Sequence, residues 1–122
     1  MTYTGDEAGT ITDGSDTITF SEVEHLILTD GADVVDATAD TAGVDVDAGE
    51  GDNTLFGGTG NDSLVTGSGN DQIHSGDGAD TIYYGDGDNT VHAGAGNDFV
   101  DEERGNPGYT GSNYVELGEG ND

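Results

Sequence analysis

An acidic or amide side chain recurs every nine residues through the middle of the chain, at a fixed place in a glycine-rich phrase. Six copies follow one another without a break from Ala48 to Asp101: AGEGDNTLF, GGTGNDSLV, TGSGNDQIH, SGDGADTIY, YGDGDNTVH and AGAGNDFVD. Each copy brings side-chain oxygens and backbone carbonyls together in a tight turn, and the block contains no lysine or arginine. The chemistry that suits such a turn is the binding of a cation.

The positions within each copy predict which elements hold these oxygens. When the phrase is numbered GGxGxDxUx, glycines fill its second position (Gly58, Gly67, Gly76, Gly85 and Gly94) and its fourth (Gly60, Gly69, Gly78, Gly87 and Gly96). Glycine permits a positive φ and a close approach of carbonyls. The eighth position holds Leu55, Leu64, Ile73, Ile82, Val91 and Val100 between mostly polar neighbours, which is the alternation of a short strand with one inward side chain. Glycines at this density exclude a helix.

The composition predicts a narrow core in a strongly acidic chain. Of the 122 residues 30% are hydrophobic, and 27 acidic residues face one basic residue, Arg104, for a net charge of −26. Nucleic acid and anionic membranes are both excluded as partners because each requires basic side chains. No cysteine is present, so a metal is the candidate for the cross-link that a small scaffold needs. Neither a membrane-inserting span nor an amino-terminal export signal is expected.

The repeat resembles the calcium-binding nonapeptide of repeats-in-toxin (RTX), or haemolysin-type, proteins. The resemblance covers Ala48 to Asp101, resumes at Leu117 to Asp122, and is weaker at Thr12 to Thr19 and Thr29 to Asp36. It implies an all-β fold, a right-handed parallel β-roll with two nonapeptides per coil. It further implies several Ca²⁺ ions held between successive turns on each edge. We expect one β-roll domain over residues 1–122, with irregular repeats in 1–47, regular nonapeptides in 48–101, and a bulged loop plus a terminal repeat in 102–122.

The resemblance also implies which residues hold the metal. One edge carries Asp62, Asp80 and Asp98, and the other carries Asn53, Asp71 and Asn89, each eighteen residues from the next. The remaining expected metal residues are Asp122 and the glycines Gly58, Gly60, Gly67, Gly69, Gly76, Gly78, Gly94 and Gly96. Because GDN replaces GND around Asn53 and Asn89, we expect weaker sites there, whereas Asp80 is expected to serve the ions on both sides of it. For Asp16 and Asp33 a ligand role and a turn role both stay open.

Three features lie outside the repeated pattern of ligands. His74 and His92 share the ninth position with Phe56, which indicates an exposed cross-strand stack or, alternatively, a transition-metal pair. Outward positions hold Val65, Thr81, Tyr83 and Phe99, which are either a lateral contact surface or ordinary exposed side chains. His25 is expected to be solvated, and Arg104 is expected to pair with a carboxylate in the bulged loop.

No catalytic residues or organic cofactor are expected, because the chain lacks HExxH, GxSxG, cysteine and lysine. The preferred hypothesis is a calcium-binding structural module of an extracellular assembly, which folds on calcium and polymerises head to tail. Joining the final GEGND to TYTGD, which follows Met1, continues the repeat, and open strand edges invite a further copy. The alternative is the calcium-binding repeat segment of a secreted RTX enzyme, toxin or adhesin. Both hypotheses place the chain outside the cell.

Overall fold

The computed structural model describes residues 8–13, 16–21, 25–102 and 111–122. These residues form strands and contain no helix, and thus none long and apolar enough to cross a membrane. The strands are β1 (Ala8–Asp13), β2 (Asp16–Ser21), β3 (His25–Ile27), β4 (Asp33–Asp36), β5 (Asp45–Asp47), β6 (Thr54–Thr59), β7 (Ser63–Val65), β8 (Gln72–Asp77), β9 (Thr81–Tyr84), β10 (Thr90–Gly96), β11 (Phe99–Glu102), β12 (Tyr114–Glu116) and β13 (Glu119–Gly120).

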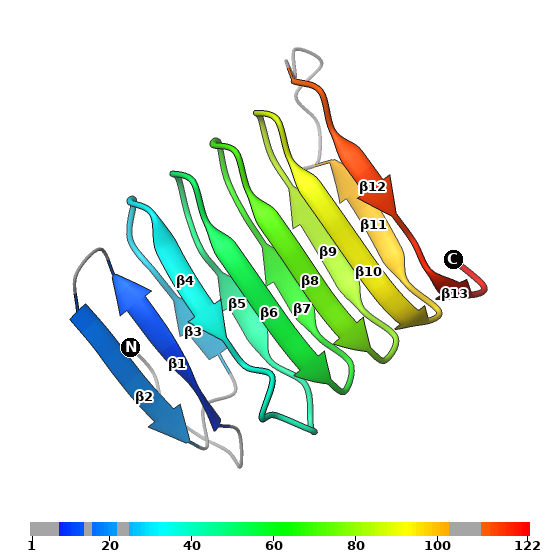
Figure 1. Cartoon of the computed structure of the whole chain (residues 1–122), viewed down its shortest axis with the longest axis horizontal. Coiled ribbons are helices and arrows are strands. Elements are labelled where there is room, and N and C mark those ends of the chain that lie inside the picture. Colours follow the sequence, from blue (N-terminus) through cyan, green and yellow to red (C-terminus); the bar gives the residue numbers. More distant parts are fainter. Residues whose placement is uncertain (1–7, 14–15, 22–24, 103–110) are drawn as a thin grey trace.

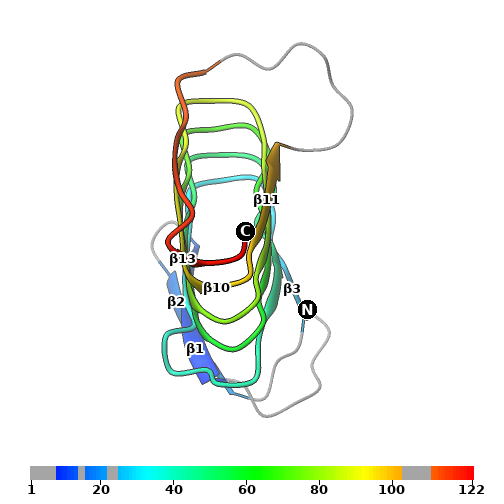
Figure 2. The same cartoon turned by 90° about the vertical axis from the view of Figure 1, so that its right-hand side faces the viewer.

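The strands from β3 onward wind back and forth between two sheets (Figures 1 and 2). The larger sheet has the order β12-β10-β8-β6-β4-β1-β2, with β13 also paired to β10, and the smaller has β11-β9-β7-β5-β3. Pairing is parallel from β4 to β13 and throughout the smaller sheet. The chain is therefore a β-solenoid of stacked two-strand coils, and the parallel β-roll expected from the sequence is confirmed.

The register shows where the coils are regular. Leu55 pairs with Ile73, and Ile73 with Val91, each eighteen residues on. Val35 pairs with Leu55 after twenty residues, and Val91 pairs with Val115 after twenty-four. The coils on either side of the regular block are therefore longer by two and six residues.

The amino-terminal end departs from the parallel pattern. Strand β1 runs antiparallel to both β2 and β4, so the weak repeat at Thr12 to Thr19 spans the end of β1 and the start of β2. The register places Asp13 opposite Asp16 and Ile11 opposite Ile18, which is the pairing of a short hairpin. Two strands without counterparts in the smaller sheet thus extend the larger sheet at this end (Figure 1).

The core is a double column of aliphatic side chains between the two sheets. Each regular strand contributes its eighth-position residue, and the most deeply buried are Leu26, Val35, Val46, Leu55, Leu64, Ile73, Ile82 and Val91. Since side chains alternate along a strand, the residues two positions before and after the eighth also face inward. The first position of the next repeat is accordingly buried at Ala48, Ala93 and Tyr84. The sixth position is buried for the same reason, which brings the repeated acids inside.

Candidate metal centre

The acid or amide at position six is buried in every regular repeat. Asp62, Asp71, Asp80 and Asp98 are at most 6% exposed, and Asn53 and Asn89 are 1% exposed. A buried carboxylate is costly unless a partner of opposite charge or hydrogen-bond donors stabilise it. What these oxygens contact therefore decides what the site can do.

One oxygen of each position-six side chain is bonded to the coil before it. The Oδ1 atoms of Asp62, Asp80 and Asp98 accept the backbone N–H of Val44, Asp62 and Asp80, at 2.9, 2.8 and 3.0 Å. On the other edge the acceptors are Asn53, Asp71 and Asn89, and the donors are Asp33, Asn53 and Asp71. These two rows of bonds, here called the inner ladders, join every regular coil to its predecessor.

Position five forms a second row that points the opposite way. The exposed Oδ1 atoms of Asn61, Asn70 and Asp88 accept backbone N–H groups of the following coil, from Ala79, Asp88 and Ser112. Asp52 likewise accepts the N–H of Asn70 at 2.8 Å. Repeats that read GDN and repeats that read GND therefore both supply one side-chain oxygen to the preceding coil and one to the following coil. In GDN the carboxylate is at position five, and in GND it is at position six.

The glycines place backbone carbonyls in the interval between coils. A Cβ added to Gly76 would overlap the carbonyl oxygen of Gly58, and one added to Gly78 would overlap that of Gly60. Gly76 and Gly78 have φ of +111° and +146°, which only glycine adopts without strain. The carbonyls of Gly58 and Gly60 thus face the coil that carries Asp80, and the same relation joins Gly76 and Gly78 to Gly94 and Gly96. Across the other edge Gly49 and Gly51 face Gly67 and Gly69 in this way.

In three of the buried acids, no hydrogen-bond donor among the described residues reaches the second carboxylate oxygen. These are the fully buried Oδ2 atoms of Asp71, Asp80 and Asp98. The hydroxyls of Thr66 and Ser75 face Asp71 and Asp80 without forming a well-directed bond, and the Ser75 hydroxyl donates instead to the carbonyl of Ala93 at 2.5 Å. A buried oxygen in this state calls for a further partner, and a bound water or a cation can supply it.

Burial makes the ionised form of Asp71 and Asp80 less favourable. Desolvation raises the pKa of Asp80, against the opposing effects of the Asp62 N–H and the Ser75 side chain, and the charges of Asp98 and Asp77 raise it further. Desolvation also raises the pKa of Asp71, with a smaller contribution from the charge of Asp52. A bound cation would stabilise both carboxylates in their ionised form.

These residues fit a hard cation that prefers oxygen ligands. In the described part of the chain, no three His, Cys, Asp or Glu side chains converge to form a metal-binding group. The intervals beside Asp71, Asp80 and Asp98 instead offer a carboxylate oxygen together with carbonyls of the turn glycines. Calcium accepts mixed sets of carboxylates and backbone carbonyls, so Asp71, Asp80 and Asp98 with these glycines would hold it, whereas zinc favours nitrogen and sulfur.

The other residues named from the sequence lie at the ends of the ladders. Asp122 accepts the backbone N–H of Asp98 at 3.1 Å and so continues the Asp62 edge. The Asp33 side chain is buried, and its backbone N–H donates to Asn53. The side chain of Asp16 and the whole of Arg104 lie outside the described residues.

Two kinds of buried polar residue were missed by the sequence analysis. Asp40 is 2% exposed and accepts the N–H groups of Ala42 and Gly43, so it stabilises the turn of the irregular coil. Thr66 and Ser75 occupy the first position of their repeats. The alternation that buries positions six and eight extends to the first position, and this signal would have found them.

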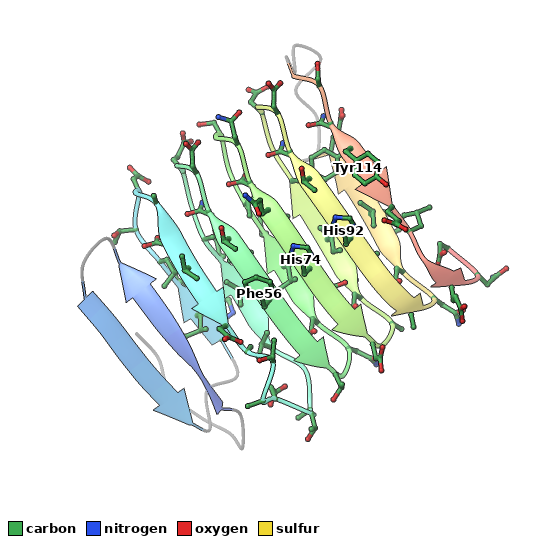
Figure 3. All side chains as sticks on the ribbon, viewed as in Figure 1. Phe56, His74, His92 and Tyr114 are labelled. Carbon is green, nitrogen blue, oxygen red and sulfur yellow. The ribbon has the colours of Figure 1, made fainter. Side chains whose placement is uncertain are left out.

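The rings at position nine form a column on the larger sheet (Figure 3). Phe56 stacks on His74 with centroids 5.1 Å apart, and His74 stacks on His92 at 4.9 Å, so the expected stack is confirmed. Tyr114 adds a tilted ring, and Glu116 bonds His92 Nδ1 at 3.0 Å. The side chain of His25 is 44% exposed, as expected, and its Nδ1 also lies 2.6 Å from Oδ2 of Asp45, because parallel pairing puts these residues side by side.

Comparison with known proteins identifies the repeat itself. Residues 47–82 and 85–106 match the family model described as the RTX calcium-binding nonapeptide repeat, in 4 copies. Neither the curated proteins nor the solved structures compared with the chain gave a match.

Proposed function

We propose that this chain, which carries RTX calcium-binding nonapeptide repeats, is a structural module whose β-roll is assembled by Ca²⁺ bound between its coils. The observation that carries the proposal is the buried carboxylate oxygens without donors, at Asp80 and Asp98 on one edge and at Asp71 on the other. Beside them, carbonyls of the turn glycines face the next coil. The calcium supplies charge compensation, and the chain's own residues supply the oxygen ligands and their spacing.

Charge repulsion explains why folding should depend on the ion. Adjacent coils bring like carboxylates to about 5 Å, where two charges repel by roughly 3 kcal/mol at an effective dielectric near 20. The aliphatic column is narrow and no disulfide supports it. Without calcium the acids would have to be buried uncompensated, so we infer that the chain is largely unfolded in chelator and becomes β-rich when calcium binds.

The proposed place of work rests on the calcium affinity that is usual for such modules. Extracellular calcium modules have dissociation constants of about 0.1–1 mM. A chain that folds in this range stays unfolded at the low calcium of a cell interior and folds outside. We therefore propose an extracellular role, as part of a structural assembly.

End-to-end association is supported by the exposed edge of the larger sheet at β12. Val115 pairs with the fully buried Val91 in the inward column and is itself 38% exposed. Tyr114 and Leu117 are exposed beside it. Strands β2 and β12 are the two edges of the larger sheet and run in the same direction. Pairing of β12 with β2 of a second copy would therefore continue the parallel pairing of this sheet. The hairpin β1–β2 leaves the smaller sheet two strands shorter at that end, so contact would form on the larger sheet alone.

A calcium titration followed by circular dichroism and sedimentation velocity tests both parts of this proposal. We expect a cooperative gain of β signal as calcium rises, and a calcium-dependent increase in sedimentation coefficient that Val115→Asp reduces. Val65→Asp, on an outward position of the same coil system, is the control and should leave the size unchanged. A folded chain that remains monomeric at all calcium concentrations would remove end-to-end association and leave the calcium-dependent module standing.

A further inference from the structure

Asn53 and Asn89 differ from the buried aspartates in what their second polar atom does. The Nδ2 of Asn53 donates to the carbonyls of Gly49 and Gly51, at 3.2 and 3.1 Å. The Nδ2 of Asn89 donates to those of Gly85 and Gly87, at 2.9 and 3.4 Å. In both repeats these carbonyls belong to the second and fourth positions of the same turn.

The aspartates present an oxygen where these amides present a donor. Asn89 and Asp80 both use Oδ1 to accept an N–H of the preceding coil, from Asp71 and Asp62. A planar side chain anchored in this way directs its second atom to the corresponding place in each turn. At Asp80 that atom is a buried oxygen without a donor, and an oxygen cannot bond to the carbonyls of its own turn.

We propose, building on the calcium role above, that the side-chain amides of Asn53 and Asn89 take the place of a cation in their own turns. Each N–H₂ group bridges two carbonyls that a bound ion would otherwise bridge, and each Oδ1 is already occupied by the preceding coil. Neither asparagine therefore keeps a side-chain polar atom without a hydrogen bond, whereas Asp80 keeps Oδ2. In this proposal the two asparagines, named as ligands from the sequence, become substitutes for the ion.

The two edges of the roll are then unequal. The edge of Asp62, Asp80 and Asp98 carries a carboxylate in each regular turn, whereas on the other edge only Asp71 stands between Asn53 and Asn89. The first edge binds a continuous row of ions. The second edge alternates between an ion and an amide, which lowers both its calcium demand and the charge that it buries.

Exchanging the side chains tests the proposal. Bound Ca²⁺ per chain would be measured by equilibrium dialysis at saturating calcium, and stability by urea unfolding. We expect Asn89→Asp to bind one more ion than the wild type, because the amide is replaced by a carboxylate facing the same carbonyls. Asn70→Asp makes the same change at exposed position five, where Oδ1 keeps its bond to the N–H of Asp88, and should leave the ion count unchanged.

The reverse exchange separates the amide's role from loss of charge. Asp80→Asn and Asp80→Ala should lose the same number of ions, but the asparagine variant should unfold at the higher urea concentration because its amide bridges Gly76 and Gly78. Equal urea midpoints for these two variants would overturn the proposal, as would an unchanged ion count in Asn89→Asp. A wild-type chain that binds no calcium at all would instead overturn the calcium role on which the proposal rests.

Discussion

Gly78→Ala is expected to destabilise the calcium-loaded chain by about 3 to 5 kcal/mol, which is the range of severe single substitutions. The new methyl group would overlap the carbonyl oxygen of Gly60 in the preceding coil. Backbone cannot rotate away as a side chain can, so the two coils would have to separate. Separation would also displace Oδ1 of Asp80 from the N–H of Asp62. Urea unfolding in excess calcium, followed by circular dichroism, measures the loss.

Gly31→Ala is the matched control for this substitution. Gly31 has φ of +151°, close to the +146° of Gly78, but a Cβ added there has nothing within 4 Å. Both variants therefore suffer the same backbone strain, about 1–3 kcal/mol, and only Gly78→Ala meets a neighbouring coil. If the two variants lost equal stability, close stacking of the glycine turns would not be what holds the coils in register.

Asp80→Ala is expected to weaken calcium binding more than any other single substitution, by roughly 100-fold or about 2.7 kcal/mol. Asp80 lies between two regular turns, since its coil meets the carbonyls of Gly58 and Gly60 on one side and the coil of Gly94 and Gly96 on the other. If ions bind in both intervals as proposed, loss of its carboxylate would therefore affect both of them. Isothermal titration of calcium into the chelator-treated protein measures the affinity.

Two comparisons make this result specific. Asp77→Ala removes an exposed carboxylate from the same turn, and salt screens its charge, so its affinity should fall less than about threefold. Asp62→Ala should have an intermediate effect, because the coil before Asp62 is irregular and holds Asp40 in a local turn instead of a repeated glycine loop. Equal losses for Asp62→Ala and Asp80→Ala would contradict the sharing of Asp80 between two ions.

The regular part of the fold was predictable because the same residue types recur at the same positions in six consecutive repeats. The glycines at positions two and four favour a turn, and the aliphatic residue at position eight favours a strand with one inward side chain. Turns and strands therefore alternate every nine residues. The inward direction of position six then follows from strand alternation, two residues before Leu64 or Ile82. The pairing of Phe56, His74 and His92 in one column has the same origin in the eighteen-residue coil.

The rest depends on interactions that a repeat pattern does not encode. TDGSDTIT resembles a repeat, but Ile11 and Ile18 pair across a hairpin, since a short polar connection between two alternating segments favours antiparallel pairing. The pairing of His25 with Asp45 arises because the irregular coil is twenty residues long. The Asn side chains look equivalent to Asp in the motif, and only the hydrogen bonds distinguish a donor facing the carbonyls from an acceptor.

The most direct test of the central claim is a crystal structure in saturating calcium, with anomalous diffraction to locate the ions. The account predicts anomalous peaks about 2.3–2.6 Å from Oδ2 of Asp80 and Asp98 and from carbonyls of the adjoining glycines, which is the usual range for calcium and oxygen. The same folded coils with no anomalous peak, and with water or empty space beside those oxygens, would contradict it.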